Sequence, residues 1–424
     1  MKNVSSINNL ENRVPKLRFP EFEGKWQIIS LEDYLIESKE LSCRKDNFPL
    51  MTSSRKGLFI QQDYFDREQI SSDDTLFSIV PKGYVTYRHM SDDDIFHFNI
   101  NKIVEYGLVS KEYPVFTTNS ELNKTFLVEY LNSSDRFLVF CKQQKKGGTR
   151  TRLYFNTLCQ HKMLAPSISE QEKITSFLIL LDQRIAKQRE LVENLKLYKR
   201  GLVSAIFGRK KRFKDKDGNE FPMWKKSMFS ELFKIHPNNT LSRSELTYSN
   251  NGVYNVHYGD VLIKFGAYID FNNDIVPTIN ASTSLKAFAD TAYLQDGDVV
   301  FADTAEDYTV GKVSEIYGLN KKLALSGLHT IPCRPNRQFA PKYLGYYFNS
   351  YTYREQMLPT IQGSKVSSIS RAELQNSYLM IPCIEEQTAI SDFLSSIDQK
   401  IIHCSYITDT LTEYKKSIMQ KIFI

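Results

Sequence analysis

Residues 166–207 read PSISEQEKITSFLILLDQRIAKQRELVENLKLYKRGLVSAIF, and residues 382–423 read PCIEEQTAISDFLSSIDQKIIHCSYITDTLTEYKKSIMQKIF. The two stretches align without a gap at a constant offset of 216 positions, and 15 of their 42 positions are identical. The identical pairs are Pro166/Pro382, Ile168/Ile384, Glu170/Glu386, Gln171/Gln387, Ile174/Ile390, Phe177/Phe393, Leu178/Leu394, Asp182/Asp398, Gln183/Gln399, Ile185/Ile401, Leu195/Leu411, Tyr198/Tyr414, Lys199/Lys415, Ile206/Ile422 and Phe207/Phe423. Identity over so long an ungapped stretch indicates an internal duplication.

Each stretch carries an apolar residue every seven positions, which is typical of a helix whose seam packs on a partner helix. The seam positions are Ile174, Leu181, Leu195, Leu202, Leu178, Ile185 and Val192 in the first stretch, and Ile390, Ile397, Leu411, Ile418, Leu394 and Ile401 in the second. A helix of about 38 residues is about 57 Å long. We expect the two helices to pack on each other as an antiparallel coiled coil.

Polar residues interrupt the seam at equivalent places in the two copies. Gln188 matches Cys404, and Lys199 matches Lys415. Such positions set the register of a coiled coil or extend a charged head from an apolar stem to water. Contact with another subunit is the alternative interpretation.

The segments that precede the two helices also echo each other. FLVEYLNS at 126–133 matches YLGYYFNS at 343–350, and the Gly-led loop GGTRTR at 147–152 matches GSKVSS at 363–368. The two Trp residues of the chain, Trp26 and Trp224, stand near the start of the two copies. The chain is therefore two copies of one plan, a globular unit followed by a long helix.

The globular segments alternate short apolar runs with turn signals, which indicates strands with a few helices. The fold class predicted is α+β, with two similar globular domains separated by two long antiparallel helices. The boundaries expected are a first globular domain at 1–165, a first helix at 166–208, a linker at 209–222, a second globular domain at 223–381 and a second helix at 382–424.

Composition is that of a folded protein without an unusual charge. Of the 424 residues, 41% are hydrophobic and 25% are charged, and the net charge is only +6. No apolar run approaches the roughly 18 residues of a membrane span. The N-terminal stretch MKNVSSINNLENR lacks the apolar core of a signal peptide. Six scattered cysteines form no C-x-x-C pair or metal-ligand cluster, so we expect reduced thiols, no metal and a cytoplasmic location.

Signatures of catalysis are missing from the sequence. The phosphate loop G-x-x-x-x-G-K-[ST], a G-x-G-x-x-G after a strand, the Asn/Asp-Pro-Pro-aromatic signature of amino-methyltransferases, G-x-S-x-G and H-E-x-x-H do not occur. Taken together, these absences favour a chain without catalytic residues or a cofactor of its own.

A basic, glycine-containing loop is the clearest candidate for a binding site. The stretch KQQKKGGTRTR at 142–152 contains five basic residues and no acid. Arg and Lys read guanine edges or hold phosphates, Gln reads adenine, and glycines let a backbone approach a groove. The alternative is an ordinary solvated loop. A second basic cluster, Lys199–Arg200 with 209–216, fits phosphate contact and a solvated linker equally well.

At this point the sequence resembles the specificity subunits of type I restriction-modification enzymes, over nearly the whole chain from about residue 14. The spacer motif P-x-x-x-E-Q-x-x-I of that family is matched twice, and the motif L-R-F-P-x-F-x-x-x-W is matched at Leu17 to Trp26, with a variant at Arg212 to Trp224. Two different classes of recognition domain are matched by Tyr87–Ser91 with Gly107–Ser110, and by Ala302–Asp307 with Val310–Lys312, Ser326–Thr330 and Gly363–Val366.

The resemblance implies a non-catalytic subunit that binds double-stranded DNA and selects the target site. Each globular domain would be a target-recognition domain that reads one half of an asymmetric, bipartite site, and each helix would be a conserved spacer. Two methyltransferase subunits that methylate adenine, and restriction or translocase subunits, would be the partners. Those partners would use S-adenosylmethionine, ATP and Mg, whereas this chain would need no cofactor.

The residues expected to bind DNA combine the basic loops with residues of the recognition-domain motifs. They are Arg88, Lys142, Lys145, Lys146, Gly148, Thr149, Arg150, Arg152, Asp303, Thr304, Glu306, Gly363, Ser364 and Lys365. The acids either accept from cytosine amino groups or order their own loop. Residues expected to dock partner subunits are Glu170, Gln171, Asp182, Gln183, Tyr198, Glu386, Gln387, Asp398, Gln399 and Tyr414.

Two other functional classes remain open at this stage. A coiled-coil scaffold or dimerisation protein without DNA specificity is one, and binding to DNA in the presence of competitor separates it from a specificity subunit. A fused methyltransferase or nuclease with an unusual motif is the other, and binding of the methyl donor by the isolated chain would support it.

Overall fold

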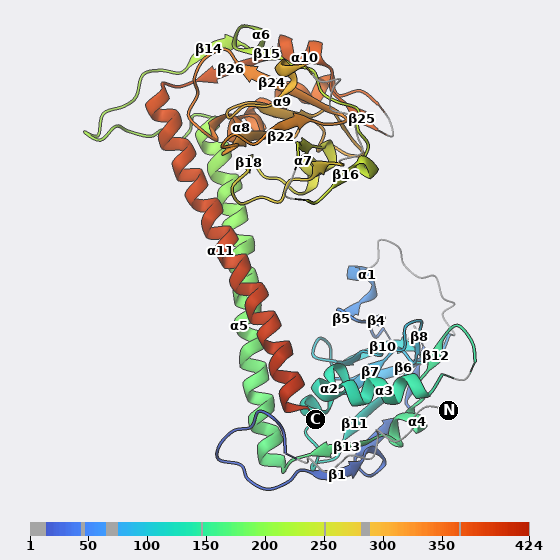
Figure 1. The fold of residues 1–424 in the computed structure, drawn as a ribbon. Coiled ribbons are helices and arrows are strands. Elements are labelled where there is room, and N and C mark those ends of the chain that lie inside the picture. The colour runs from blue at the N-terminus through green and yellow to red at the C-terminus, as the bar shows by residue number, and fades with distance from the viewer. Residues whose placement is uncertain are drawn as a thin grey trace. The chain divides into compact units, whose positions relative to one another are not determined.

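The structure is a computed structural model that describes residues 14–43, 47–64, 75–145, 147–249, 252–280, 289–363 and 366–423 (Figure 1). Its contacts divide the chain into two compact units. Unit 1 consists of 1–189 with 406–424, and unit 2 consists of 190–405. Each unit therefore contains one globular segment and one end of each long helix.

The two long helices form as the heptad pattern predicts. Helix α5 is Ile168–Phe207 and helix α11 is Ile384–Ile422. Apolar seam residues such as Ile174, Leu178 and Ile390 are almost fully buried. Burial of these seams on a neighbouring helix supplies most of the stability of such long helices, because helical propensity alone is weak.

Ion pairs between the helices establish their direction. In unit 1, Lys415 Nζ lies 2.7 Å from Asp182 Oδ2, and in unit 2, Lys199 Nζ lies 2.5 Å from Asp398 Oδ1. The two ion pairs are equivalent, because Lys415 matches Lys199 and Asp182 matches Asp398 in the two repeats. The end of one helix therefore packs on the beginning of the other in both units, and the predicted antiparallel arrangement is confirmed (Figure 1). The seam lysines pair within the chain.

The globular part of unit 1 is a mixed body of strands and helices, coloured blue to green in Figure 1. Its sheets have the strand orders β10-β6-β3 and β2-β11-β7-β9, with the two-stranded pairs β1-β13, β8-β12 and β4-β5. The strands are β1 Gln27–Ser30, β2 Leu35–Ser38, β3 Leu41–Ser42, β4 Met51–Ser54, β5 Gly57–Ile60, β6 Phe77–Pro81, β7 Val85–Tyr87, β8 Met90–Ser91, β9 Phe98–Ile100, β10 Tyr106–Ser110, β11 Val115–Thr118, β12 Thr151–Arg152 and β13 Lys162–Ala165. The helices are α1 Gln61–Tyr64, α2 Lys124–Ser133, α3 Asp135–Gln143 and α4 Phe155–Cys159, with a 3-10 turn at Leu31–Asp33.

Unit 2 contains a five-stranded sheet of order β15-β24-β20-β22-β18 and a four-stranded sheet of order β16-β19-β17-β23, with the pairs β14-β26 and β21-β25. The strands are β14 Lys225–Met228, β15 Phe233–Ile235, β16 Leu246–Thr247, β17 Tyr254–Val256, β18 Tyr268–Asp270, β19 Thr278–Ile279, β20 Val299–Ala302, β21 Thr304–Ala305, β22 Val313–Tyr317, β23 Ala324–Ser326, β24 Thr330–Pro335, β25 Ser367–Ser368 and β26 Tyr378–Ile381. The helices are α6 Phe229–Leu232, α7 Tyr258–Ile263, α8 Tyr343–Phe348, α9 Tyr351–Met357 and α10 Arg371–Asn376, with 3-10 turns at Arg243–Glu245, Asp290–Ala292 and Leu358–Thr360.

The duplication extends well into the globular parts. Helices α3 and α9, strands β12 and β25, helices α4 and α10, and strands β13 and β26 each begin 216 residues apart, the offset of the long helices. The Ser134 and Ser350 side chains cap α3 and α9 in the same way, by accepting from the backbone N–H three residues later. At the far end of each helix, Phe423 packs on Phe126 in unit 1 and Phe207 packs on Tyr347 in unit 2.

The E-Q pair at the start of each long helix has an internal role. The Glu170 carboxylate accepts from Arg18 Nε at 2.8 Å and from Trp26 Nε1 at 3.3 Å. The repeat has the same triad, in which Glu386 accepts from Arg212 and Trp224. The neighbouring glutamines are also buried: the Gln171 side chain bonds Asn123 N and Pro166 O, and the Gln387 side chain bonds Ala340 N and Pro382 O.

These contacts correct the expectation that Glu170, Gln171, Glu386 and Gln387 face a partner subunit. At most 2% of each residue is exposed, so no partner reaches their side chains. Their identity in the two repeats follows from the same internal hydrogen bonds. In each case the pair fastens the segment around a Trp to the first turn of a long helix.

Within the described ranges, no helix is long and apolar enough to span a membrane. The same residues contain no group of three or more His, Cys, Asp or Glu side chains placed to hold a metal ion.

Candidate nucleic-acid interface

In unit 1 the basic loop leads into a short antiparallel ribbon. Strand β12 pairs with β8, with Thr151 opposite Ser91 and Arg152 opposite Met90. Gly147 and Gly148, which precede β12, have φ angles of 50° and 142°, so this turn uses backbone conformations that favour glycine. The ribbon thereby places the basic loop beside the residues that follow β8.

Those residues are Asp92, Asp93 and Asp94, and they pair with cations from other segments. Arg150 Nε lies 2.7 Å from Asp92 Oδ1, and Lys145 Nζ lies 3.9 Å from an Asp94 oxygen. Asp93 pairs with Arg55 of the β4–β5 turn. The hydrogen bond from Arg55 lowers the pKa of Asp93 to about 2, so this carboxylate is charged at neutral pH.

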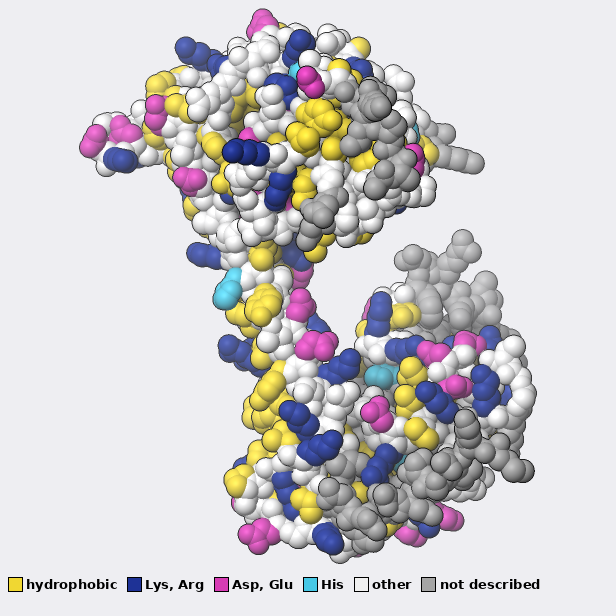
Figure 2. Space-filling view, viewed as in Figure 1, with side chains coloured by type: hydrophobic (Ala, Val, Ile, Leu, Met, Phe, Trp, Pro, Cys, Tyr) yellow, Lys and Arg dark blue, Asp and Glu magenta, His cyan; other side chains and the backbone are white. Residues whose placement is uncertain are grey.

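The acidic triplet changes the electrostatic interpretation of the basic loop. In the sequence the loop has no acid among its eleven residues, whereas in the fold three carboxylates lie beside it. Figure 2 shows Lys and Arg side chains lying among Asp and Glu side chains on the visible face of unit 1. These exposed pairs add little to stability, because water screens them, but they hold the long basic side chains in place.

A polar groove of about 820 Å³ adjoins the ribbon. Its lining includes Arg55, Lys56, Arg88, Asp92 and Asp93. Arg88 is exposed, while the neighbouring Tyr87 is buried and donates its hydroxyl hydrogen bond to the Leu153 carbonyl. Tyr87 therefore belongs to the core, and Arg88 is the residue of this motif that faces solvent.

Unit 2 contains an equivalent ribbon. Strand β25 pairs with β21, with Ser368 opposite Thr304 and Ser367 opposite Ala305. The turn before β25 includes Gly363 at φ 105°, where a Cβ atom would lie 1.9 Å from the Val366 carbonyl oxygen. Only glycine fits there. The two Gly-led loops, matched in the sequence, therefore precede equivalent strands of equivalent ribbons.

A strained histidine supports the second ribbon. His329 has a φ angle of 53°, a backbone conformation that residues other than glycine rarely adopt. Its carbonyl accepts from Asp303 N at 3.1 Å, and its Nδ1 lies 3.4 Å from Asp303 Oδ1 and 3.4 Å from Thr304 Oγ1. Backbone strain of this kind gathers at functional sites. No pattern in the sequence indicates this strain, because it is a property of the folded backbone.

The acids of this ribbon differ in their surroundings. Asp303 accepts from Thr304 Oγ1 at 2.7 Å and Asp307 accepts from Thr309 N at 2.8 Å, so both order their own loop. Glu306 is exposed and makes no hydrogen bond or ion pair with any residue that the structure describes. Of these acids, Glu306 is the one whose carboxylate is free to accept from a base.

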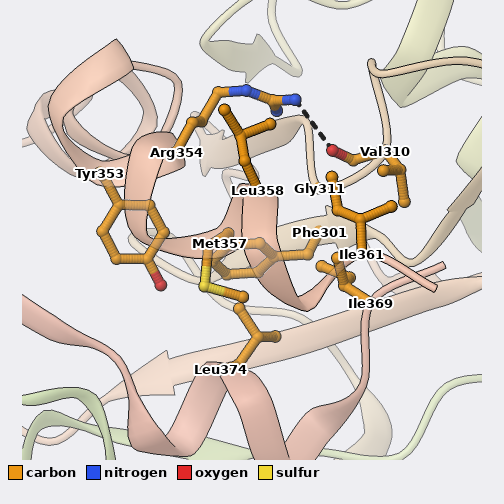
Figure 3. Close-up of a pocket in the computed structure, with 10 residues that line it drawn as sticks. All are labelled: Phe301, Val310, Gly311, Tyr353, Arg354, Met357, Leu358, Ile361, Ile369 and Leu374. Carbon is orange, nitrogen blue, oxygen red and sulfur yellow. Dashed lines mark hydrogen bonds between the residues drawn. The ribbon is translucent and has the colours of Figure 1, made fainter. Parts of the chain in front are cut away.

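Beneath the loop lies a small apolar cavity (Figure 3). Arg354 of α9 lies at its rim and donates to the carbonyls of Tyr308, at 2.6 Å, and Val310, at 3.0 Å. Burial lowers the pKa of the Arg354 guanidinium. Neither Arg354 nor the acidic triplet stands out in the sequence, because their partners lie some 40 to 60 positions away.

The remaining predicted DNA-binding residues are placed as follows. Lys142 lies in the last turn of α3, and Lys142, Lys145, Gly148, Thr149, Arg150 and Arg152 are all exposed. Lys146, Ser364 and Lys365 lie outside the described residues. In unit 1, Lys145, Arg150 and Arg152 thus lie on or beside the ribbon.

Among the remaining residues predicted to dock partners, Asp182, Gln183, Tyr198, Gln399 and Tyr414 are exposed on the long helices. Asp398 is partly buried, because it pairs with Lys199 and accepts from the Tyr346 hydroxyl at 2.6 Å. The equivalent tyrosines Tyr198 and Tyr414 are similarly exposed, at 56% and 59%. The two helices therefore carry matching exposed residues.

The comparisons with known proteins agree with this architecture. Residues 223–412 match the family model described as the type I restriction modification DNA specificity domain. Over 129 residues, the chain is 28% identical to a protein of Methanocaldococcus jannaschii described as the specificity subunit of the type I restriction enzyme MjaX. That match spans 30% of this chain and 30% of the relative.

Two solved structures share the fold along nearly the full length of the chain. A chain from a structure on complex assembly and conformational transition of the type I R-M system has a TM-score of 0.56 at 15% identity, with 95% of this chain and 98% of that chain covered. The S subunit of a type I restriction-modification system from M. genitalium has a TM-score of 0.51 at 13% identity, with 97% and 99% covered. The resemblance noted in the sequence is thereby confirmed: residues 223–412 match the type I restriction modification DNA specificity domain, and the chain has the fold of the specificity subunits.

Proposed function

We propose that this chain is the DNA-binding specificity subunit of a type I restriction-modification complex and that each unit reads one half of a bipartite target. The observation that carries the proposal is the duplicated ribbon, which joins a Gly-led loop to a polar loop in each unit. Arg150 and Arg88 in unit 1, and Glu306 in unit 2, offer the donors and acceptor that base edges require.

The division into half-sites follows from the duplication. The chain has two recognition segments, one in each unit, and each would contact its own patch of one duplex. The base-facing residues of the two segments differ. Unit 1 presents arginines, whereas the described part of the unit 2 ribbon presents Thr304, Glu306 and Tyr308. The two half-sites should therefore differ in sequence, and half-sites about one helical turn apart suit a single face of the duplex.

The matching exposed residues on the long helices support docking of two copies of one partner. Tyr198 matches Tyr414, and Gln183 matches Gln399, at the offset of the duplication. We assign this surface to methyltransferase subunits, which would supply adenine methylation, with the restriction subunits joining the same cytoplasmic complex. This chain would contribute recognition without catalysis.

Docking is tested best with the tyrosines, because charge reversal at Asp182 or Asp398 would also break an ion pair between the helices. Tyr198→Ala with Tyr414→Ala should prevent co-purification of the methyltransferase subunit while leaving the thermal unfolding of this chain unchanged. The matched control is Tyr378→Ala, which lies on β26. Full assembly by the double variant would remove these tyrosines from the interface.

DNA recognition is tested by a methylation map. The chain is co-expressed with its methyltransferase partner, and modified adenines are located in the host DNA. A split motif with two unrelated halves is the expected result. A stable complex that neither methylates a motif nor shifts DNA in the presence of competitor would overturn the proposal and favour a coiled-coil scaffold.

A further inference from the structure

The loop that follows β21 presents one tyrosine to solvent. The Tyr308 residue is 81% exposed. The loop spans Glu306–Thr309 and closes on itself through Asp307, whose carboxylate accepts from Thr309 N at 2.8 Å and also from Thr309 Oγ1. The backbone that carries the ring is therefore fixed locally.

A second set of contacts fixes the same loop from below. Arg354 donates to the carbonyls on either side of Thr309, those of Tyr308 and Val310. Figure 3 shows the bond to Val310. Gly311, at φ 77°, then returns the chain to the sheet, where its N–H bonds the Ala302 carbonyl at 2.8 Å. A Cβ atom at Gly311 would lie 3.4 Å from Ile369, so the chain passes close to the core at this point.

Burial of the Arg354 guanidinium costs folding free energy, and this cost indicates that the loop has a function beyond stability. A guanidinium that leaves water gives up hydration, and here it donates to two carbonyls of an exposed loop. The nearby Asp307 carboxylate offsets part of the cost. The ring itself gains nothing from burial. A rigid, exposed tyrosine is instead well suited to binding, because it offers a large contact area and loses little conformational freedom.

The loop that holds Tyr308 lies next to the proposed DNA-facing residues of unit 2. It begins at β21, whose partner β25 follows the Gly363 turn, and the equivalent ribbon of unit 1 leads to the loop that holds Arg150. The loop that holds Tyr308 follows β21, whereas the loop that holds Arg150 precedes β12, so the two loops lie at opposite strands of equivalent ribbons. The ring is continuous with Thr304 and Glu306, the proposed DNA-facing residues of unit 2.

We propose that Tyr308 is a specificity-determining residue that packs its ring on a base of the second half-site, and that Arg354 is a positioning residue that holds the loop for this contact. The inference rests on the proposed DNA-binding function. Contact of the ring with a base edge in the groove, such as the methyl group of thymine, favours one base over the others, and the hydroxyl adds a hydrogen bond to a base edge or a phosphate.

The test uses the complete complex with its methyltransferase subunits and a duplex that carries the methylation-mapped target. Tyr308→Ala should weaken binding of this duplex about tenfold, as the loss of one base contact does. Tyr308→Phe should stay within about threefold of wild type. In the methylation map, Tyr308→Ala should relax one position of the second half-site and leave the first half-site unchanged.

A fluorescent base gives a readout that a merely structural role would not move. With 2-aminopurine placed in turn at each position of the second half-site, wild type should alter the emission at one position, and Tyr308→Ala should abolish that change. Tyr378→Ala, on β26 of the same unit, is the matched control and should behave as wild type.

The positioning role of Arg354 is tested by combining variants. Arg354→Gln should weaken binding of the duplex alone but should add little to Tyr308→Ala, because both act through one ring. An equal further loss in the Tyr308→Ala background would mean that Arg354 contacts DNA itself, and the positioning role would be wrong. Unchanged affinity and motif for Tyr308→Ala, in a wild-type complex that binds, would overturn the inference alone. Failure of the wild-type complex to bind would overturn the proposed function.

Discussion

Replacing Glu170 with glutamine removes one charge from a buried cluster without changing its shape. In the folded protein, Glu170 Oε1 accepts from Arg18 Nε at 2.8 Å and Oε2 accepts from Arg18 Nη2 at 2.7 Å. The side chains of Glu170 and Arg18 are 2% and 14% exposed. A glutamine would keep one accepting oxygen, but its N–H₂ group would face a donor of Arg18 at the place of the other oxygen.

The expected loss of stability follows from that burial. Breaking a buried ion pair by removing one partner costs about 3–5 kcal/mol, because the remaining charge is left without compensation. In a domain of roughly 200 residues, 1 kcal/mol lowers Tm by about 2–4 °C. The Glu170→Gln variant should therefore unfold on the order of 10 °C below wild type.

The assay is calorimetric unfolding of the full chain, with two comparison variants. Glu386→Gln removes the equivalent carboxylate in unit 2, which accepts from Arg212 at 2.6 Å, and should give a loss of similar size. Glu172→Gln changes an exposed acid on the same helix and should stay close to wild type. If Glu170→Gln unfolds with Glu172→Gln, the Arg18 pair does not fasten the globular part of unit 1 to its helix.

Three further predictions concern pH and DNA. Burial lowers the pKa of His161 to about 4. The contribution of His161 to stability is therefore complete above about pH 6.5 and is lost as the pH falls toward 4. Chemical denaturation between about pH 4 and 7 should show this loss in wild type but not in His161→Gln. Burial raises the pKa of Glu315 to about 8, so the contribution of Glu315 to stability is complete below about pH 4.5 and is lost as the pH rises through 8. Glu315→Gln keeps an oxygen that accepts from Gly345 N and should remain stable at high pH. A wild-type stability that does not change between about pH 5 and 9 would contradict the assignment. Arg150→Ala should weaken DNA binding by about 1–3 kcal/mol and relax one position of the first half-site if the guanidinium reads a base; unchanged affinity and motif in the methylation map would exclude it.

The sequence predicts the long helices well because their determinants are local and repeated. The heptad spacing of Ile174, Leu181 and Leu202 indicates a helix that begins near Pro166, and the structure has α5 at Ile168–Phe207. The shared offset of the two copies also predicts equivalent Gly-led loops, which precede β12 and β25 as expected.

What could not be predicted depends on contacts between distant segments. Glu170 and Glu386 were expected to face a partner subunit, and only the fold brings Arg18 and Arg212 to them. Likewise, Asp92 compensates a loop 58 positions away in the sequence. Periodicity and local charge carry no information about such pairings.

The central claim is that each unit reads its own half of one target. The most direct measurement exchanges residues 1–165 for the corresponding segment of a relative with a different target and maps adenine methylation in cells that also contain the methyltransferase partner. We predict that one half of the motif changes to that of the donor while the other half and the spacing stay as they were. A motif that changes in both halves, or in neither half while methylation persists, would contradict the claim.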